Sequence, residues 1–181
     1  MTLHVVTGGP GSGKTSLINA LAAAGHPTLP ESGRNIIREQ VATGDRALPW
    51  DDQEAFAQAM EAADRRAYAA MPNRNGAVFL DRGLPDIIGY RALSGLPISP
   101  TLEADCRATI RYASPIFIAP PWPEIYATDS ERRQDFGEAD RTCAFMRETY
   151  AALGYALVEL PHASVAERVA FILRSAGVSA A

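Results

Sequence analysis

Apolar residues follow two alternating patterns along the chain. Continuous apolar runs that end at glycine, aspartate or proline are typical of buried strands. They predict strands at 3–7, 76–81, 115–119 and 156–160, with a brief extended segment at 27–31. Residues between these runs show helical spacing, which predicts helices at 14–24, 33–42, 51–71, 84–94, 101–112, 138–153 and after Ser164. Wholly apolar strands separated by helices are typical of a parallel sheet covered on both faces, so we predict an α/β fold.

Polar or turn-forming residues stand where four of these extended segments end. Gly8, Glu31, Asp81 and Pro120 each lie at or just after such an end. In an open parallel sheet the carboxyl ends of the strands meet at one edge, and ligands bind there. We therefore expect residues that are far apart in the sequence to converge at that edge.

The composition indicates one globular domain spanning residues 1–181. The chain has a net charge of −4 and 47% hydrophobic residues, which gives no general attraction to nucleic acid or to an anionic membrane. No apolar stretch approaches the roughly 20 residues that span a bilayer. The first apolar run leads straight into glycines, so we expect no secretory leader and a cytoplasmic location, with Cys106 and Cys143 as free thiols.

The segment between the first strand and the first helix is a complete phosphate-binding motif. Its sequence, GGPGSGKTS, matches G-x-x-x-x-G-K-[ST]. Glycines let backbone N–H groups turn toward a phosphate, and the following helix points its positive end at the same anion. Lys14 is the only lysine among 17 basic residues, which indicates a position where a flat guanidinium cannot replace a compact ammonium. The predicted nucleotide-binding residues are Gly8, Gly9, Pro10, Gly11, Ser12, Gly13, Lys14, Thr15 and Ser16.

Asp81 and Arg82 end the third extended segment. An aspartate at this point, together with the Thr15 hydroxyl, is expected to hold Mg²⁺ directly or through water. Arg82 stands where ATP-hydrolysing motors commonly carry a glutamate that prepares water. An arginine cannot act as that base, but it can clamp an acceptor or the transferred phosphoryl group. The alternative for Arg82 is a surface ion pair with Asp86.

Glu31 ends the short extended segment after the first helix. Its carboxylate is expected to face the same crevice, where it could accept the proton of an acceptor hydroxyl as a general base. An acidic residue is also favoured at the start of a helix, so a structural role at the helix near Ser32 is the alternative.

Two adjacent arginines, Arg132 and Arg133, lie in the polar segment after the fourth strand. We expect residues 120–140 to act as a lid, with one of these arginines closing over the transferring phosphate. A solvated run of charges is the alternative reading.

Five stretches of the chain together resemble a known family. They are GGPGSGKTSL, PESGRNIIREQ, VFLDRGLPD, IYATDSERR and LVELPHASVAERVAFIL. They resemble bacterial AAA-like P-loop ATPase/kinase domains, which are grouped with the ribosylnicotinamide kinase domain and, more distantly, with deoxynucleoside and thymidylate kinases. The resemblance implies a P-loop NTPase fold: a three-layer α/β/α sandwich with a five-stranded parallel sheet in the order 2-3-1-4-5.

The resemblance also implies roles for single residues. In the similar nucleoside kinases the glutamate that ends the second strand is the catalytic base, which corresponds to Glu31, and the acidic-Arg pair corresponds to Asp81 and Arg82. The segment 32–75 would cover the acceptor pocket. A glutamine on its long helix reads the acceptor base in those enzymes, and Gln58 and Gln53 both compete for that place.

These observations predict an ATP-dependent small-molecule kinase with Mg²⁺ as its metal. The expected catalytic residues are Lys14, Glu31, Asp81, Arg82, Arg132 and Arg133. The acceptor would be a small hydroxylated, nucleoside-like molecule, which follows from the resemblance. The chain has no NKxD-type motif, so ATP is expected rather than GTP. A hydrolytic ATPase or GTPase acting on a partner, and a nucleotide-dependent switch with little turnover, remain the alternatives.

Overall fold

A five-stranded parallel sheet forms the centre of the protein. The computed structural model describes residues 1–71, 76–126 and 135–179. The strands lie in the order β2-β3-β1-β4-β5, and every pairing is parallel. This confirms the α/β fold and the strand order 2-3-1-4-5. The strands are β1 Thr2–Gly8, β2 Thr28–Leu29, β3 Ala77–Asp81, β4 Ile116–Ala119 and β5 Leu157–Glu159.

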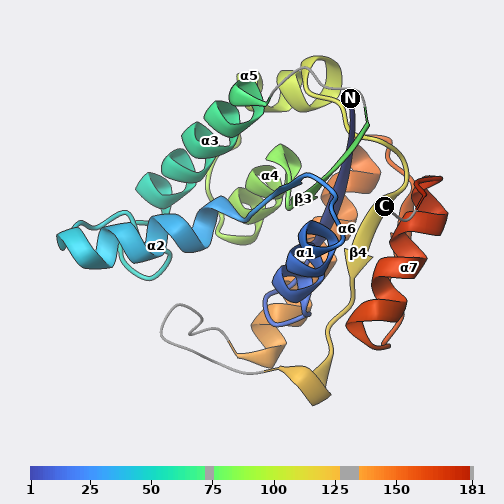
Figure 1. The fold of residues 1–181 in the computed structure, drawn as a ribbon. Helices are drawn as coiled ribbons and strands as arrows, with labels where there is room; N and C mark the ends of the chain where they lie inside the picture. The colour runs from blue at the N-terminus through green and yellow to red at the C-terminus, as the bar shows by residue number, and fades with distance from the viewer. Residues whose placement is uncertain (72–75, 127–134, 180–181) are drawn as a thin grey trace.

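Helices cover both faces of the sheet, as Figure 1 shows. They are α1 Lys14–Ala23, α2 Ser32–Thr43, α3 Gln53–Ala70, α4 Leu84–Leu93, α5 Pro100–Ala104, α6 Phe136–Ala152 and α7 Val165–Ala176, with short turns η1 Asp105–Thr109 and η2 Pro123–Ile125. Helices α1 and α7 pack together on one face, and α4 and α6 pack together on the other. Helices α2 and α3 form a pair that lies against α4, away from the sheet (Figure 1).

The alternation of side chains along β1 separates two hydrophobic cores. Leu3 and Val5 belong to the core under α4 and α6, whereas Val6 belongs to the core under α1 and α7. Phe79 and Leu80 of β3 divide in the same way. Because successive residues of a strand point to opposite faces, a continuous apolar strand is buried on both sides. The sheet edge that carries the loops after β1 and β3 is thereby held between two packed layers.

One predicted helix ends earlier than its pattern indicates. The helix predicted at 101–112 is observed as α5 followed by the π-helical turn η1, and residues 110–112 are not helical. The Tyr112 backbone N–H donates to the Tyr155 hydroxyl, and the Tyr112 hydroxyl accepts from the Leu84 backbone N–H. These tertiary hydrogen bonds replace the ones that a longer helix would have made.

No helix within the described residues is both long enough and apolar enough to cross a membrane.

Candidate functional site

The loop between β1 and α1 wraps one end of a cavity of about 880 Å³, which residues Pro10 to Ser16 help to line. Gly13, at the N-cap of α1, has a φ of 78°, a conformation that glycine adopts without a steric penalty. Gly9 is required for a different reason, because a Cβ there would collide with the backbone carbonyl of Ala139 on α6. Two different constraints therefore select glycine in this motif: backbone conformation and close packing.

Lys14 lies beneath this loop with only 5% of its surface exposed. Its ammonium donates to the carbonyl oxygens of Gly9, at 2.6 Å, and Gly8, at 3.2 Å. Burial and the neighbouring Arg82 lower the pKa of Lys14 to about 8. The ammonium also contacts the Ser12 hydroxyl at 3.3 Å. A buried ammonium held by neutral dipoles is stabilised when an anion enters, so this arrangement suits a phosphate.

Thr15 and Asp81 meet at the edge of the sheet, as the sequence predicted for a metal site. The Thr15 hydroxyl donates to one carboxylate oxygen of Asp81 at 3.2 Å, and the other oxygen, Oδ1, is buried without a hydrogen-bond partner. Burial and the charge of Glu31 raise the pKa of Asp81 to about 6. A carboxylate short of positive charge beside a hydroxyl fits Mg²⁺, which takes few protein ligands and fills its shell with phosphate and water oxygens. In the described part of the chain no cluster of three or more His, Cys, Asp or Glu could hold a metal.

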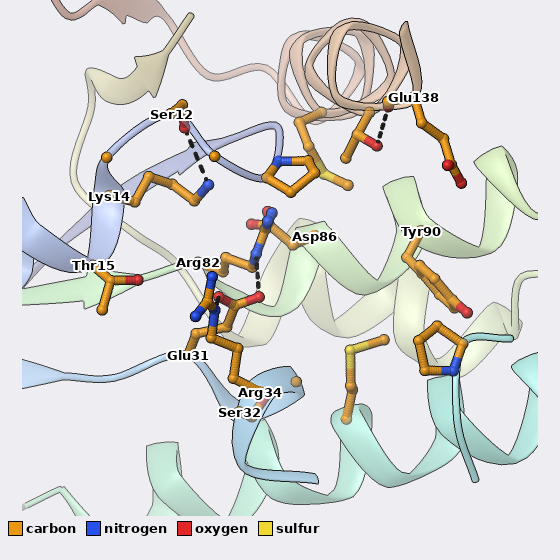
Figure 2. A pocket seen from close by; sticks show the side chains of 18 of the residues that line it. Ser12, Lys14, Thr15, Glu31, Ser32, Arg34, Arg82, Asp86, Tyr90 and Glu138 are labelled. Carbon is orange, nitrogen blue, oxygen red and sulfur yellow. Dashed lines mark hydrogen bonds and ion pairs between the residues drawn. The ribbon is translucent and has the colours of Figure 1, made fainter. Parts of the chain in front are cut away.

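Glu31 and Arg82 form an ion pair that faces the same space as Lys14 (Figure 2). The Arg82 Nε donates to Glu31 Oε1 at 3.0 Å. Burial alone would raise the pKa of Glu31, but the charges of Arg82 and Lys14 outweigh it and hold the pKa below its usual value. Glu31 occupies the N-cap position of α2, yet its side chain makes no capping hydrogen bond. Its carboxylate therefore points into the cavity instead of closing the helix end.

Arg82 adopts a backbone conformation that is rare for its residue type. Its φ is 74°, the only positive φ of a non-glycine residue in the described ranges. Such a conformation costs about 1–2 kcal/mol and persists where surrounding contacts impose it. Those contacts are hydrogen bonds from the guanidinium to Glu31, to the Gly8 carbonyl and to Asp86. The ion pair with Asp86 exists at 2.9 Å, but it is buried and not at the surface.

Asp86 fixes Arg82 from the protein interior. Its side chain is 4% exposed. Its carboxylate accepts hydrogen bonds from Arg82, Thr7, Tyr150 and the Gly83 backbone N–H. The network joins β1, β3, α4 and α6, so it holds the cavity wall to the sheet on which the phosphate loop is mounted. Because these contacts are tertiary, the sequence pattern gave no sign of Asp86 beyond its spacing from Arg82.

Replacing Tyr150 with phenylalanine tests this network. The variant is expected to lose about 1–3 kcal/mol of unfolding free energy, because a hydrogen bond to a buried charge is removed while three other donors remain on Asp86. Chemical denaturation measures the loss, and nucleotide affinity should change little. Tyr155→Phe is the matched control, since within the described residues its hydroxyl makes one hydrogen bond, accepted from the uncharged Tyr112 backbone N–H at 3.2 Å. A Tyr150 variant that is less affected than the Tyr155 variant would contradict the proposed importance of the network.

The cavity also contains residues that the sequence analysis did not assign to the site. Arg168 of α7 is 2% exposed and donates to the Ser12 carbonyl of the phosphate loop at 3.1 Å. Trp122 lies beneath the Arg168 guanidinium and stacks on His162, with ring centroids 5.0 Å apart. Arg141 of α6 lines the cavity as well. An arginine in a helix carries no sequence signal that separates a cavity position from a solvent-exposed one.

Some predicted residues are not placed at the site. Arg132 and Arg133 lie outside the described residues. Gln58 is exposed and donates to Glu54, whereas Gln53 lines the cavity. Of the two glutamines that competed for the acceptor, only Gln53 is in position to meet one.

The strand order, the glycine-rich loop before α1 and the buried Lys14 define a P-loop NTPase fold. Residues 3–168 match the model of the family AAA_28, described as an AAA domain. This range includes most of the chain, and the protein belongs to that family. The comparison with curated proteins gives no significant match.

Solved structures with the same fold include a NadR protein and two kinases. The NadR protein in complex with NR has a TM-score of 0.76 and 22% identity over 99% of this chain, which spans 53% of the NadR chain. Thymidylate kinase from Ehrlichia chaffeensis has a TM-score of 0.66 and 14% identity, covering 97% of this chain and 98% of its own. Deoxyadenosine kinase from M. mycoides has a TM-score of 0.64 and 11% identity, covering 98% of both chains. At these identities the likeness shows the fold alone.

Proposed function

We propose that the protein is a phosphotransferase that moves the γ-phosphate of Mg²⁺·ATP to a hydroxyl of a small molecule. The single observation that carries this proposal is the position of the Glu31–Arg82 pair. It stands beside Lys14, between the phosphate loop and the part of the cavity formed by α2, α3 and α4. An ATP-hydrolysing motor uses the base near the γ-phosphate to activate water. Here the Glu31 carboxylate faces a space large enough for an acceptor, so we assign it to the acceptor hydroxyl instead.

Each side chain has a distinct task in this reaction. Lys14 and the loop backbone bind the β- and γ-phosphates, and Thr15 and Asp81 would hold Mg²⁺, which neutralises charge on the phosphates. Glu31, kept ionised by Arg82, accepts the proton of the acceptor hydroxyl. Arg82 donates to Glu31 and orients it, and its fixed position lets it stabilise negative charge on the phosphoryl group.

The similar structures support this proposal in general terms. One NadR structure contains NR, another contains NAD and AMP-PNP, and the deoxyadenosine kinase structure contains dcmp and dcdp. All of these ligands are nucleotides or small molecules. We propose a nucleotide and a small acceptor as the ligands of this chain, with ATP as the phosphoryl donor.

The test is ADP release from Mg²⁺·ATP, measured without acceptor and then with nucleosides, nucleotides, sugars and amino alcohols. A low background rate that one class of compound raises sharply is the expected result. A steady rate that no acceptor changes would instead favour a hydrolytic NTPase, and Glu31 would lose its proposed role.

Replacing Arg82 with lysine should reduce turnover about tenfold or more while ATP binding changes less. A lysine has one charge centre and cannot reach Glu31, the Gly8 carbonyl and Asp86 together. Single-turnover rates and ATP titrations separate the two effects. Arg91→Lys is the control, because Arg91 forms a paired contact with Glu54 outside the cavity. That control should lose stability without losing turnover. If Arg82→Lys also loses only stability, Arg82 has a structural role in its ion pairs and no role in turnover.

A further inference from the structure

The helix α3 carries a carboxylate on the face that it turns toward the cavity. Phe56 and Met60 are buried on this face, at 4% and 9% exposure, and Asp64 follows one helical turn later. All three side chains line the cavity. The spacing of four residues places an aspartate where the helical pattern otherwise puts apolar side chains. Asp64 itself is half-buried, and removing a carboxylate from water is unfavourable unless a partner compensates it.

The compensation that the structure supplies to Asp64 is small. Ser32, the first residue of α2, gives it a side-chain hydrogen bond. Burial, with further contributions from Asp86 and Glu31, raises the pKa of Asp64 to about 6, although that bond and the charge of Arg82 act in the opposite direction. Among the described residues no arginine, lysine or histidine forms an ion pair with it. The Asp64 carboxylate therefore retains acceptor capacity that a bound molecule can use.

The charges at this end of the cavity have an excess of one sign. The described lining from the N-cap of α2 onward through α2 and α3, and from Arg82 through α4, contains three carboxylates and two guanidinium groups: Glu31, Asp64 and Asp86 against Arg34 and Arg82. Arg82 already donates to two of these carboxylates. Arg34 in turn forms an ion pair with Glu31, with its Nε 3.8 Å from Glu31 Oε2. An anionic group would enter an environment that already holds more negative than positive charge.

The rest of the described lining has the reverse balance. The phosphate loop, α6 and α7 contribute Lys14, Arg141 and Arg168, against Glu138. Lys14 lies at the boundary between the two groups, because it and Arg82 donate to the same Gly8 carbonyl. The lining thus changes from net positive on the phosphate loop, α6 and α7 to an excess of carboxylates on the side of α2, α3 and α4. Repulsion between carboxylates and an anionic ligand discriminates against that ligand, just as attraction favours a ligand of the opposite charge.

We propose that Asp64 is a specificity-determining residue of the acceptor site, and that it selects acceptors that carry hydrogen-bond donors and no negative charge over nucleotides and other anions. Its carboxylate accepts hydrogen bonds from hydroxyl or ammonium groups of the acceptor. This inference rests on the proposed function and names the substrate class of the same site. A kinase of this kind phosphorylates a nucleoside or amino sugar and not a nucleoside monophosphate.

The experiment compares acceptors that differ in charge. Steady-state ADP release from Mg²⁺·ATP is measured with nucleosides, their 5′-monophosphates, glucosamine, and the pair uridine and orotidine, which differ by one carboxylate. For the wild type, an uncharged or cationic member of the panel should have at least about tenfold higher kcat/KM than its anionic counterpart. Asp64→Asn should raise the KM of that acceptor about tenfold or more with a smaller change in kcat, and it should narrow the discrimination against the anion.

Controls separate acceptor selection from damage to the fold. Glu61→Gln removes a carboxylate from the same helix outside the cavity, where it pairs with Arg65, and it should leave KM unchanged. Acceptor binding without turnover is measured as the rise in melting temperature that each compound causes in the presence of a non-hydrolysable ATP analogue. Asp64→Asn should reduce that rise for uncharged and cationic compounds while the rise caused by the nucleotide analogue alone persists.

Three results would overturn this inference. They are a wild-type preference for the 5′-monophosphates or for orotidine, an unchanged KM in Asp64→Asn, and a failure of every uncharged and cationic compound to bind. A preference for anionic acceptors would leave the proposed kinase activity standing. ADP release that no acceptor changes would contradict the kinase itself, so the two failures are distinguishable.

Discussion

Replacing Lys14 with alanine is expected to abolish nucleotide-dependent activity and to weaken nucleotide binding about 10- to 100-fold, because the phosphate loop loses its charge-assisted hydrogen bond to the phosphates. Lys14 is 5% exposed, and its ammonium donates to two carbonyl oxygens and the Ser12 hydroxyl of the loop. Arg82 shares only the Gly8 carbonyl with it and is held by Glu31 and Asp86, so it does not replace the ammonium under the loop. Isothermal titration with an ATP analogue measures the binding, and ADP release measures the activity.

The folded state should tolerate this change. Without nucleotide the melting temperature of Lys14→Ala should stay close to that of the wild type, whereas the rise that nucleotide causes should be lost. Lys14→Arg is the informative companion, since the Nζ atom lies 2.6 Å from the Gly9 carbonyl and the space does not suit a flat, wider guanidinium. Arg174→Ala, which removes an exposed charge outside the cavity, is the control. Full activity in Lys14→Ala would reject the phosphate-loop assignment.

Glu31→Gln is expected to lower turnover on the order of 100-fold or more while nucleotide binding stays near normal, because the variant loses the base but keeps the shape of the side chain. The glutamine retains an oxygen that can accept from Arg82 Nε, at the place where Glu31 Oε1 now lies at 3.0 Å. The position of Arg82 is also maintained by Asp86 and the Gly8 carbonyl. Single-turnover phosphoryl transfer with saturating acceptor isolates the chemical step.

The control for this variant is Glu39→Gln, on the exposed surface of the same helix. It removes one carboxylate from α2 without touching the cavity and should leave both turnover and binding unchanged. If Glu31→Gln loses nucleotide binding and turnover to the same extent, Glu31 is a structural partner of Arg82 and not the base.

Elements that depend on consecutive residues can be predicted from the sequence pattern. The apolar run of β1, the glycines after it and the helix that begins at Lys14 form a unit of consecutive residues, and each part depends on its neighbours in the chain. The same holds for the start of α7, where Ser164 and Glu167, three residues apart, make reciprocal capping hydrogen bonds. The prediction of a helix over 101–112 was wrong at its C-terminal end, because Tyr112 makes hydrogen bonds with Leu84 and Tyr155, which are far away in the sequence.

The phosphate loop, the parallel sheet and the edge at which Glu31, Asp81 and Arg82 meet can all be derived from the sequence. These features follow from residue types at fixed spacing, where backbone conformation and burial leave few alternatives. The pairing of Glu31 with Arg82 and the position of Asp64 of α3 at the cavity become visible only in the folded protein. Those contacts join segments tens of residues apart, and they depend on how α2 and α3 pack against α4, which no local pattern encodes.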